Sequence, residues 1–334
     1  MALEMEEQPA ALERLLSRAG EVADAAREVL PAALAGIVIV ARGSSDHAGT
    51  FGRYVLEMAA RRPVSLAAPS LHTLYHAEVD YSGYLAVAVS QSGHTPEIAE
   101  VLSRMQSMGA KGLAITNSGS NPLADVAHVG VSLEVGPEQA VPATKTFTAQ
   151  LMALALLAGA LDPAAFPPEA LAGVPAAVGA VLGDPGPVHE VCAGLAGAPG
   201  LVFVTRGHLY ATASEAALKV KETCALLADA YSAADLRHGP IATVRPGVPV
   251  VAFRGEDPPD RDVSELAAEL RGRGVTVFEA SAQPGSALPL PAGLPGWGLP
   301  VVAAVRAQQL ARTLALLLGR DPDRPPGLTK VTPT

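Results

Sequence analysis

Leu85-Ala-Val-Ala-Val-Ser-Gln-Ser-Gly-His-Thr-Pro-Glu97 joins an apolar run to a polar turn and a helix start. The apolar run, 85–89, includes two β-branched valines and is typical of a strand that is buried on both faces of a parallel sheet. Pro96 suits the first position of a helix, where its missing N–H costs nothing, and Thr95 is then the expected N-cap. The stretch therefore predicts a buried strand, a tight turn and a helix.

The turn itself is a candidate anion site. Small hydroxyl residues and a glycine fill it, and a helix begins directly after it. Such a turn directs free backbone N–H groups and the positive end of the helix dipole to one point, which suits a phosphate group. Ser, Gly and Thr are equally common in an ordinary strand–helix turn. Taken alone, the residues leave both interpretations open.

Strands and helices alternate through the rest of the first half. Gly36–Gly49 is expected to hold a buried strand that ends in a Gly/Ser turn. The other expected elements are helices at 9–30, 50–61, 96–108 and 144–161, a short strand and loop at 67–75, and strands at 112–116 and 128–134. Alternation of this kind predicts a parallel sheet between two helical layers, a three-layer α/β sandwich.

Composition narrows the class of protein. The 334 residues are 49% hydrophobic and 17% charged, which is enough for two packed domains. A formal net charge of −9 makes nucleic acid an unexpected partner. Cys192 and Cys224 are too few for a metal cluster or a disulfide framework. The acidic start does not resemble a signal peptide, and apolar runs such as 151–161 are too short to span a bilayer. We expect a cytoplasmic protein without membrane contact.

The second half repeats the pattern of the first. Ile37–Gly43 resembles Leu201–Gly207, including a shared Arg-Gly, and at the same spacing the strand at 85–89 falls on 249–253. A third strand at 275–278 keeps nearly the same offset. Three strands in one order predict a duplicated domain. Residues 163–187 are rich in Pro, Ala and Gly and are expected to connect the two copies, with Pro175 interrupting any helix there.

Four reactive side chains stand out in the second half. Lys219 and Glu222 lie three residues apart and share a face of an expected helix at 214–224. From spacing alone a surface ion pair is the commoner interpretation. His238 lies in an expected polar loop at 230–240, where a lone histidine is usually solvated. Lys330 lies in a short irregular tail, where a single lysine usually has no role.

Six blocks of sequence change these interpretations. They are Arg42-Gly-Ser-Ser45, Ser90-Gln-Ser-Gly-His-Thr95, Val141-Pro-Ala-Thr-Lys-Thr-Phe147, Ala217-Leu-Lys-Val-Lys-Glu222, Leu236-Arg-His-Gly-Pro240 and Leu328-Thr-Lys330. They occur together and in the order shown by the sugar isomerase (SIS) family. The chain resembles the tandem SIS domains, in particular the isomerase half of glucosamine-6-phosphate synthase and the stand-alone SIS-type glucosamine-6-phosphate deaminases.

The resemblance implies two tandem SIS domains, each a parallel β-sheet flanked by helices in a three-layer α/β/α sandwich. The implied organisation is an N-terminal helix at 1–30, a phosphosugar-binding SIS domain at 31–162, a linker at 163–187, a second SIS domain at 188–320, and a tail at 321–334 that completes the active site.

The resemblance also implies roles for particular residues. Glu222 would move a proton between C1 and C2 of the sugar with help from Lys219. His238 would open the sugar ring from the neighbouring subunit of a homodimer, and Lys330 would sit at the carbonyl end, where the family's synthase forms an imine. The residues implied in binding a hexosamine or hexose 6-phosphate are Ser44, Ser45, Ser90, Gln91, Ser92, Thr95 and Val141.

General chemistry agrees with these roles. Aldose–ketose interconversion needs a carboxylate base beside a carbon that a carbonyl or imine makes acidic. It also needs an amine for the imine and a proton relay at the ring oxygen. Glu222, Lys330 and His238 supply the three groups. These steps call for no metal and no organic cofactor.

Departures from the synthase leave the substrate open. Arg42 stands where the synthase has a cysteine, Ala143 replaces a hydroxyl, and His94 stands where a glutamate is usual. No cysteine precedes Cys192, so we expect no glutaminase nucleophile and no use of glutamine as ammonia source. The first hypothesis is therefore a deaminase that converts glucosamine 6-phosphate to fructose 6-phosphate and ammonia. A fructosamine-6-phosphate deglycase, another phosphosugar isomerase and a non-catalytic phosphosugar sensor are the alternatives.

Overall fold

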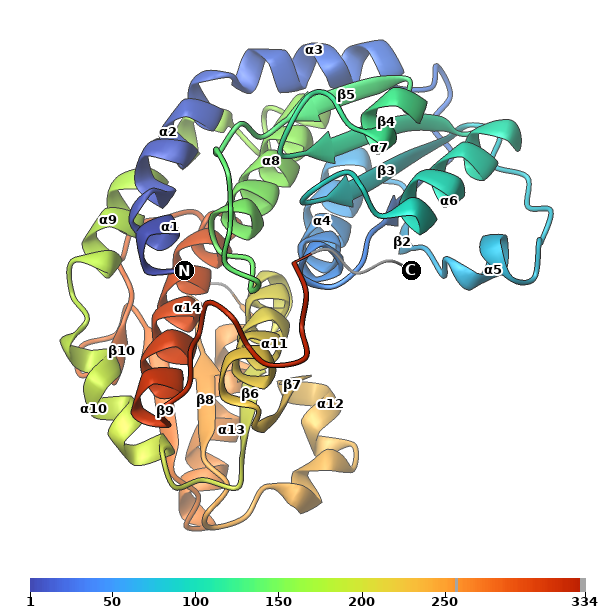
Figure 1. Cartoon of the computed structure of the whole chain (residues 1–334). Helices are drawn as coiled ribbons and strands as arrows, with labels where there is room; N and C mark the ends of the chain where they lie inside the picture. Colours follow the sequence, from blue (N-terminus) through green and yellow to red (C-terminus); the bar gives the residue numbers. More distant parts are fainter. Residues whose placement is uncertain (256–257, 331–334) are drawn as a thin grey trace. The chain divides into compact units, whose positions relative to one another are not determined.

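The computed structural model describes residues 1–255 and 258–330 and divides into two compact units, each built on one sheet (Figure 1). The first-sheet unit comprises Ala10–Pro137 and Lys145–Ala172. The second-sheet unit comprises Met1–Pro9, Glu138–Thr144 and Gly173–Lys330. The units are therefore not the sequential blocks that the sequence predicts. Of the expected tail at 321–334, residues 331–334 lie outside the described part of the chain.

The first sheet has five parallel strands in the order β2-β1-β3-β4-β5. The strands are β1 (Gly36–Val40), β2 (Val64–Leu66), β3 (Tyr84–Ser90), β4 (Lys111–Thr116) and β5 (Val129–Ser132). The run that predicts a buried strand is β3, the central strand, and it pairs with β1 on one side and β4 on the other. Every residue from Leu85 to Ser90 is buried. The prediction of a strand covered on both faces is confirmed.

Helices cover both faces of this sheet. The helices are α2 (Gln8–Ser17), α3 (Ala19–Val29), α4 (Ser44–Ala60), α5 (Ser70–Thr73), α6 (Pro96–Ser107), α7 (Pro122–Val126) and α8 (Lys145–Leu161), with a 3-10 turn η1 (Pro168–Leu171). Helices α3 and α4 pack on one face with α8 against both of them, and α6 and α7 pack on the other. The three-layer architecture is therefore confirmed for this unit.

Three local predictions for this unit are wrong. The single helix expected at 9–30 is broken at Arg18, whose backbone leaves the helical region (φ −101°, ψ 18°) and whose side chain binds the Ser132 carbonyl at 3.1 Å. Helix α4 begins at Ser44 instead of residue 50. The short strand expected within 67–75 is β2, which ends before that range, and α5 occupies part of it.

The second sheet also has five parallel strands, in the order β10-β9-β8-β6-β7. The strands are β6 (Gly200–Thr205), β7 (Leu227–Ser232), β8 (Val250–Phe253), β9 (Val277–Ser281) and β10 (Leu288–Pro289). In each sheet the strand that comes first along the chain lies between the second and the third: β1 lies between β2 and β3, and β6 lies between β7 and β8. The same topology confirms the duplication. Strand β7 overlaps the expected polar loop; it pairs only with β6 at the sheet edge, where polar side chains are tolerated.

Helices again cover both faces of the second sheet. The helices of this unit are α1 (Ala2–Glu6), α9 (Val174–Leu182), α10 (Gly186–Leu195), α11 (Tyr210–Cys224), α12 (Ala233–Arg237), α13 (Asp260–Gly272) and α14 (Leu299–Leu317), with 3-10 turns η2 (Gly207–Leu209) and η3 (Pro240–Thr243). The Pro-rich stretch that we expected to be interrupted forms α9. Pro175 lies in its first turn, where it starts the helix instead of breaking it.

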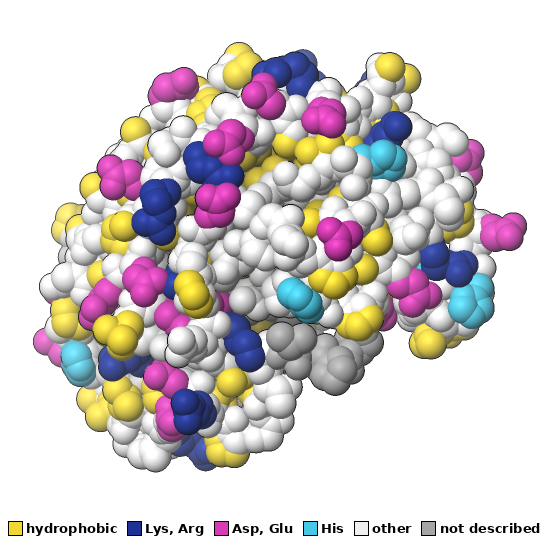
Figure 2. Space-filling model, turned by 45° about the horizontal axis from the view of Figure 1, so that its top comes forward, with side chains coloured by type: hydrophobic (Ala, Val, Ile, Leu, Met, Phe, Trp, Pro, Cys, Tyr) yellow, Lys and Arg dark blue, Asp and Glu magenta, His cyan; other side chains and the backbone are white. Residues whose placement is uncertain are grey.

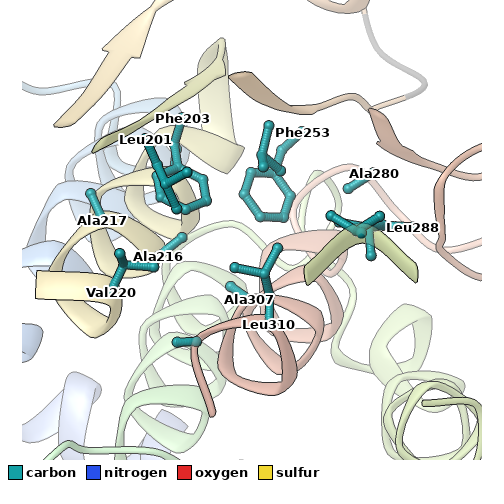
Figure 3. Close-up of a cluster of buried hydrophobic side chains, with 14 of the residues drawn as sticks. Leu201, Phe203, Ala216, Ala217, Val220, Phe253, Ala280, Leu288, Ala307 and Leu310 are labelled. Atoms are coloured by element: carbon teal, nitrogen blue, oxygen red, sulfur yellow. The ribbon is translucent and has the colours of Figure 1, made fainter. Parts of the chain in front are cut away.

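A single apolar cluster holds α11 and α14 against the second sheet (Figure 3). The rings of Phe203 and Phe253, from adjacent strands, stack with centroids 6.3 Å apart. Val220 of α11 and Leu310 of α14 pack under them and are fully or almost fully buried. Each large side chain removed from water in this way contributes about 1.5–3 kcal/mol to folding. Helix α11, which carries Lys219 and Glu222, is thus firmly seated.

Charged side chains of both signs are interspersed over the face drawn in Figure 2, without a continuous basic area. Within residues 1–255 and 258–330, no helix alone has the length and hydropathy needed to cross a bilayer, although one bent pair, Pro168–Leu182 and Gly186–Leu195, passes on length and composition.

Candidate active site

The turn after β3 is held by its own serines. Ser90 Oγ accepts a hydrogen bond from the backbone N–H of Gly93 at 3.1 Å, and Ser92 Oγ accepts one from the N–H of His94 at 3.1 Å. A serine hydroxyl that accepts a bond still has its own hydrogen to donate. The two hydroxyls therefore shape the turn and keep a donor each for a ligand. Gln91, between them, is half-buried.

Helix α6 starts as predicted, with Pro96 in its first turn and Thr95 at the N-cap position. Thr95 has extended backbone angles (φ −73°, ψ 111°), but its side chain makes no capping hydrogen bond. The prediction of Thr95 as the N-cap residue is therefore confirmed, and its hydroxyl makes no capping bond. An anion at this end of a twelve-residue helix would meet backbone N–H groups and the positive dipole end.

A second turn, after β4, supports the serine turn, and the sequence did not single it out. Asn121 donates through Nδ2 to Thr116 Oγ1 at 2.9 Å and to the Ser118 carbonyl at 2.7 Å, and its Oδ1 accepts from the Ala124 N–H at 2.9 Å. Gly93 packs on this amide with a φ of +68°; a Cβ there would lie 2.0 Å from Asn121 Oδ1. Only glycine fits at position 93, so the Asn121 side chain holds the turn after β3 in place.

The turn after β1 lies at the same sheet edge, because β1 and β3 are parallel neighbours. The chain leaves β1 toward β2 and leaves β3 toward β4, in opposite directions, which makes this edge the topological switch point where open α/β sheets bind ligands. Ser44 and Ser45 are the first residues of α4. Ser45 is buried, and its Oγ accepts from Gln150 Nε2 at 3.0 Å.

Arg42 joins the two turns. Its guanidinium donates to both carboxylate oxygens of Glu97, in the first turn of α6, at 2.8 and 3.0 Å. The hydrogen bond to Glu97 raises the pKa of Arg42. Burial raises the pKa of Asp46, in the first turn of α4, against the opposing effects of His47 and Arg42. The residue that replaces the synthase's cysteine is therefore a charged brace between the turns.

In the second-sheet unit, Lys219 and Glu222 are not a surface pair, so the interpretation from spacing alone is wrong. The Lys219 side chain is fully buried, and its Nζ lies 3.2 Å from Glu215 Oε1 and in hydrogen-bonding contact with Glu222 Oε2. Burial by itself would lower the pKa of Lys219, but the carboxylates of Glu215 and Glu222 outweigh it and raise that pKa. A buried ammonium thus lies between two carboxylates.

Only Glu222 of this cluster reaches the surface. Its side chain is 20% exposed, whereas those of Glu215 and Lys219 are at most 1% exposed. An ammonium that stays protonated beside it stabilises the ionised carboxylate. The arrangement can present a carboxylate base to a ligand and keep a proton donor behind it.

The remaining predicted residues also lie in the second-sheet unit. His238 follows α12 and is exposed. Lys330 Nζ lies 2.8 Å from Glu138 Oε2, and the Val141 backbone N–H donates to the Asp323 carbonyl at 3.0 Å. The part of the chain that the structure describes holds no group of three or more His, Cys, Asp or Glu residues arranged to bind a metal ion.

Two sheets of one topology, the first with a hydroxyl-lined turn at its switch point, define a protein of duplicated parallel α/β domains. The family model of the SIS domain matches residues 35–160 and 194–289. The chain belongs to the SIS-domain family.

Relatives of known name include glutamine–fructose-6-phosphate aminotransferase [isomerizing] of Symbiobacterium thermophilum, 36% identical over 99% of this chain and 58% of the relative. The chain thus spans little more than half the length of that protein. A proposed phosphosugar isomerase of Silicibacter pomeroyi has a solved structure with a TM-score of 0.87 and 32% identity, covering 97% of this chain and 99% of that one. The C-terminal domain of glucosamine-fructose-6-phosphate aminotransferase of Francisella tularensis has a solved structure with a TM-score of 0.86 and 27% identity, covering 96% of this chain and 97% of that one.

Proposed function

We propose that this protein is a deaminase that converts glucosamine 6-phosphate and water to fructose 6-phosphate and ammonia by aldose–ketose chemistry. The observation that carries the proposal is the partly exposed Glu222 carboxylate against the buried Lys219 ammonium. A carboxylate held in this way suits proton transfer at a carbon next to a carbonyl. Similarity to proteins named phosphosugar isomerase and aminotransferase [isomerizing] supports the same chemistry.

The hydroxyl-lined turn would bind the phosphate. In this proposal Ser90, Ser92 and Thr95 donate hydroxyl hydrogens to the phosphate oxygens, and the N-terminus of α6 adds its dipole. Gln91, Ser44 and Ser45 would hold the same group or its nearest sugar hydroxyls, and Val141 would bind the far end of the sugar. Ser45 would then donate its hydrogen while its oxygen stays bound to Gln150.

The chemical steps follow from the substrate. Ring opening, assisted by His238, frees an aldehyde at C1 of the amino sugar. Glu222 removes the proton from C2, which the aldehyde makes acidic, and returns it to C1, while Lys219 supports transfer of a proton from the C2 amine nitrogen to the C1 oxygen. The product is the C2 imine of fructose 6-phosphate. Water adds to that imine and ammonia leaves, which restores the C2 ketone and balances the reaction. Lys330 would lie at this carbonyl end of the sugar, where its amine can displace the ammonia from C2 as an imine that the water then hydrolyses.

His238 would act across a dimer. Its exposed position after α12 leaves the imidazole accessible to a second copy of the chain. A two-fold dimer is the commonest soluble oligomer and would give two equivalent sites. We therefore propose a homodimer in which His238 of each subunit contributes to the active site of the other.

The decisive experiment is ammonia release from glucosamine 6-phosphate by the wild-type chain. Glu222→Gln keeps the shape of the side chain and removes the base, so kcat should fall about 10²–10⁴-fold. Glu190→Gln, an exposed carboxylate on α10, is the matched control and should retain full activity. An unchanged rate for Glu222→Gln would remove this residue from the mechanism.

Other family chemistries are separated by a substrate panel. Fructosamine 6-phosphate and hexose 6-phosphates, with coupled detection of fructose 6-phosphate and glucose 6-phosphate, test the deglycase and isomerase alternatives. These alternatives share the base and the phosphate turn. Thermal stabilisation by amino-sugar phosphates without any turnover would instead identify a sensor.

A further inference from the structure

Glu138 is a buried carboxylate whose two oxygens face different partners in the second-sheet unit. Its side chain has 0% exposed surface, and Oε2 lies 2.8 Å from Nζ of Lys330, in the C-terminal tail. Oε1 accepts a hydrogen bond from the Thr144 backbone N–H at 2.9 Å. The carboxylate is therefore oriented by a backbone donor on one side and meets the tail amine on the other.

The segment that carries Glu138, residues 138–144, is held in place by hydrogen bonds to α1 and α14. The carboxylate of Glu4, in α1, accepts from the backbone N–H groups of Gln139 and Ala140. Gln308 Nε2, from α14, donates to the Thr144 carbonyl at 3.1 Å. A fixed segment gives Glu138 a fixed position.

The tail has no regular secondary structure from residue 320 to 330, so its contacts with this segment decide where Lys330 lies. It meets the segment through the Asp323 carbonyl, which accepts from the Val141 N–H at 3.0 Å, and through Lys330 itself. The Lys330 side chain is 22% exposed, so the amine is held and still accessible to a ligand.

We propose that Glu138 is the positioning residue for Lys330, and this inference rests on the proposed function. A flexible four-carbon lysine on an irregular tail has many accessible positions, and a buried carboxylate of fixed orientation selects one of them. The same carboxylate is an acceptor, 2.8 Å away, for the proton that the ammonium must lose before it reacts.

The covalent step balances with these groups alone. Glu138 takes one proton from the Lys330 ammonium, and the freed nitrogen lone pair adds to C2 of the imine that isomerisation has formed. The former imine nitrogen receives the two remaining hydrogens of the lysine nitrogen and leaves as ammonia, and a C=N bond forms between C2 and Lys330. Return of the proton from Glu138 gives the protonated imine, to which water adds, and loss of the lysine amine then leaves the C2 ketone of fructose 6-phosphate.

The test uses the full chain with Glu138→Gln, Glu138→Asp, and Glu190→Gln as a matched control on the surface of α10. The first readout needs no activity: the rate at which an amine-reactive acetylating reagent modifies Lys330, measured by mass spectrometry. We expect this rate to rise several-fold in Glu138→Gln, less in Glu138→Asp, and not at all in Glu190→Gln. Deuterium uptake by the tail peptide should rise in the same order.

The second readout is turnover of glucosamine 6-phosphate. Misplacing a reacting group by about 1 Å costs on the order of a hundredfold, so kcat of Glu138→Gln should fall by that factor with little change in KM. In a Lys330→Met background the Glu138→Gln change should have no further effect on kcat. Should Glu138→Gln fail to fold, Glu138→Asp keeps the charge and carries the same test.

The two proposals fail separately. Unchanged labelling of Lys330 in both Glu138 variants overturns the positioning role, whatever the turnover. Faster labelling of Lys330 in the Glu138 variants, together with a wild-type chain that has no turnover, supports the Glu138–Lys330 contact and refutes the proposed reaction.

Discussion

Single side chains in this protein take their chemistry from burial more than from spacing. Lys219 and Glu222 have the spacing of countless surface pairs, yet the lysine is fully buried and its pKa is raised by two carboxylates. The serine hydroxyls in the turn after β3 likewise accept hydrogen bonds from backbone N–H groups of the same turn. Neither the burial of Lys219 nor the hydrogen bonds of the serines can be read from a sequence motif, because both depend on the residues that pack around the motif in the fold.

Gly93 is the residue at which the turn after β3 should be most sensitive to substitution. Gly93→Ala places a Cβ 2.0 Å from Asn121 Oδ1 at a φ of +68°. The left-handed backbone costs an alanine about 1–2 kcal/mol, and displaced Asn121 hydrogen bonds add about 1 kcal/mol each. We expect urea unfolding to show a loss of about 2–4 kcal/mol, and KM for glucosamine 6-phosphate to rise more than kcat falls.

Gly119→Ala is the matched control, since a Cβ at Gly119 meets nothing within 4 Å. It should leave both the stability and KM close to wild type. Equal effects of the two substitutions would contradict the assignment of Asn121 and Gly93 as the support of the turn.

At the scale of elements, the sequence predicts best those segments whose pattern is local. Apolar runs predicted β1, β3, β4 and β6 within a residue or so, because strands buried on both faces need a continuous apolar run. Strand β7 was missed because an edge strand with one partner carries polar residues. Arg18 broke an expected helix through a contact with Ser132, more than a hundred residues along the chain, which no local pattern contains.

The candidate site was predictable to a similar extent. The site residues in the matched blocks were proposed because six blocks coincide in order, whereas Asn121 meets Gly93 and Glu138 meets Lys330 through contacts between distant parts of the sequence. The repeat shows one more feature of this kind. Arg42 pairs with Glu97 at 2.8 Å, and Arg206, its counterpart after β6, pairs with Asp262 at 3.0 Å in the first turn of α13. The shared Arg-Gly thus braces the same helix start in each copy.

Helix α14 should protect both cysteines of the chain from alkylating reagents. Cys192 of α10 donates to the Leu310 carbonyl at 3.4 Å, and Cys224 of α11 donates to the Ala311 carbonyl at 3.5 Å. Burial raises the pKa of both thiols, that of Cys192 from 9.0 to about 12. At pH 8.5 the thiolate fraction of Cys192 is then about a thousandfold smaller than in the unfolded chain.

Iodoacetamide labelling followed by mass spectrometry checks this. Both cysteines should resist labelling in the folded protein and react fully in urea. Because the folded pKa of Cys192 is the higher one, its contribution to stability is complete below pH 9.0 and is lost as the pH rises toward about 12. Rapid labelling of the native chain at pH 8.5 would show that α14 does not cover these thiols.

At the scale of the whole molecule, the two repeats have kept one topology and diverged in chemistry. The first-sheet unit holds the hydroxyl-lined turn, and the second-sheet unit holds Glu222, His238 and Lys330. The chain carries a net charge of −9, so the proposed anionic substrate would have to be held by local donors against an unfavourable overall field. We expect the apparent affinity for sugar phosphate to change little with the overall charge and strongly with the turn's hydroxyls.

The proposed exchange of His238 between subunits makes a prediction that only an assembly can meet. Glu222→Gln and His238→Ala chains are each expected to be inactive. If His238 serves the neighbouring subunit, a heterodimer purified through two different tags contains one site with both changes and one intact site, so it should show about half of wild-type activity. A heterodimer of Glu222→Gln and Lys219→Ala chains is the matched control, because these two residues contact each other on α11 of one chain and neither site is intact. Light scattering must first show a dimer. A dimer in which the His238 pairing recovers no more activity than this control would mean that each chain uses its own histidine.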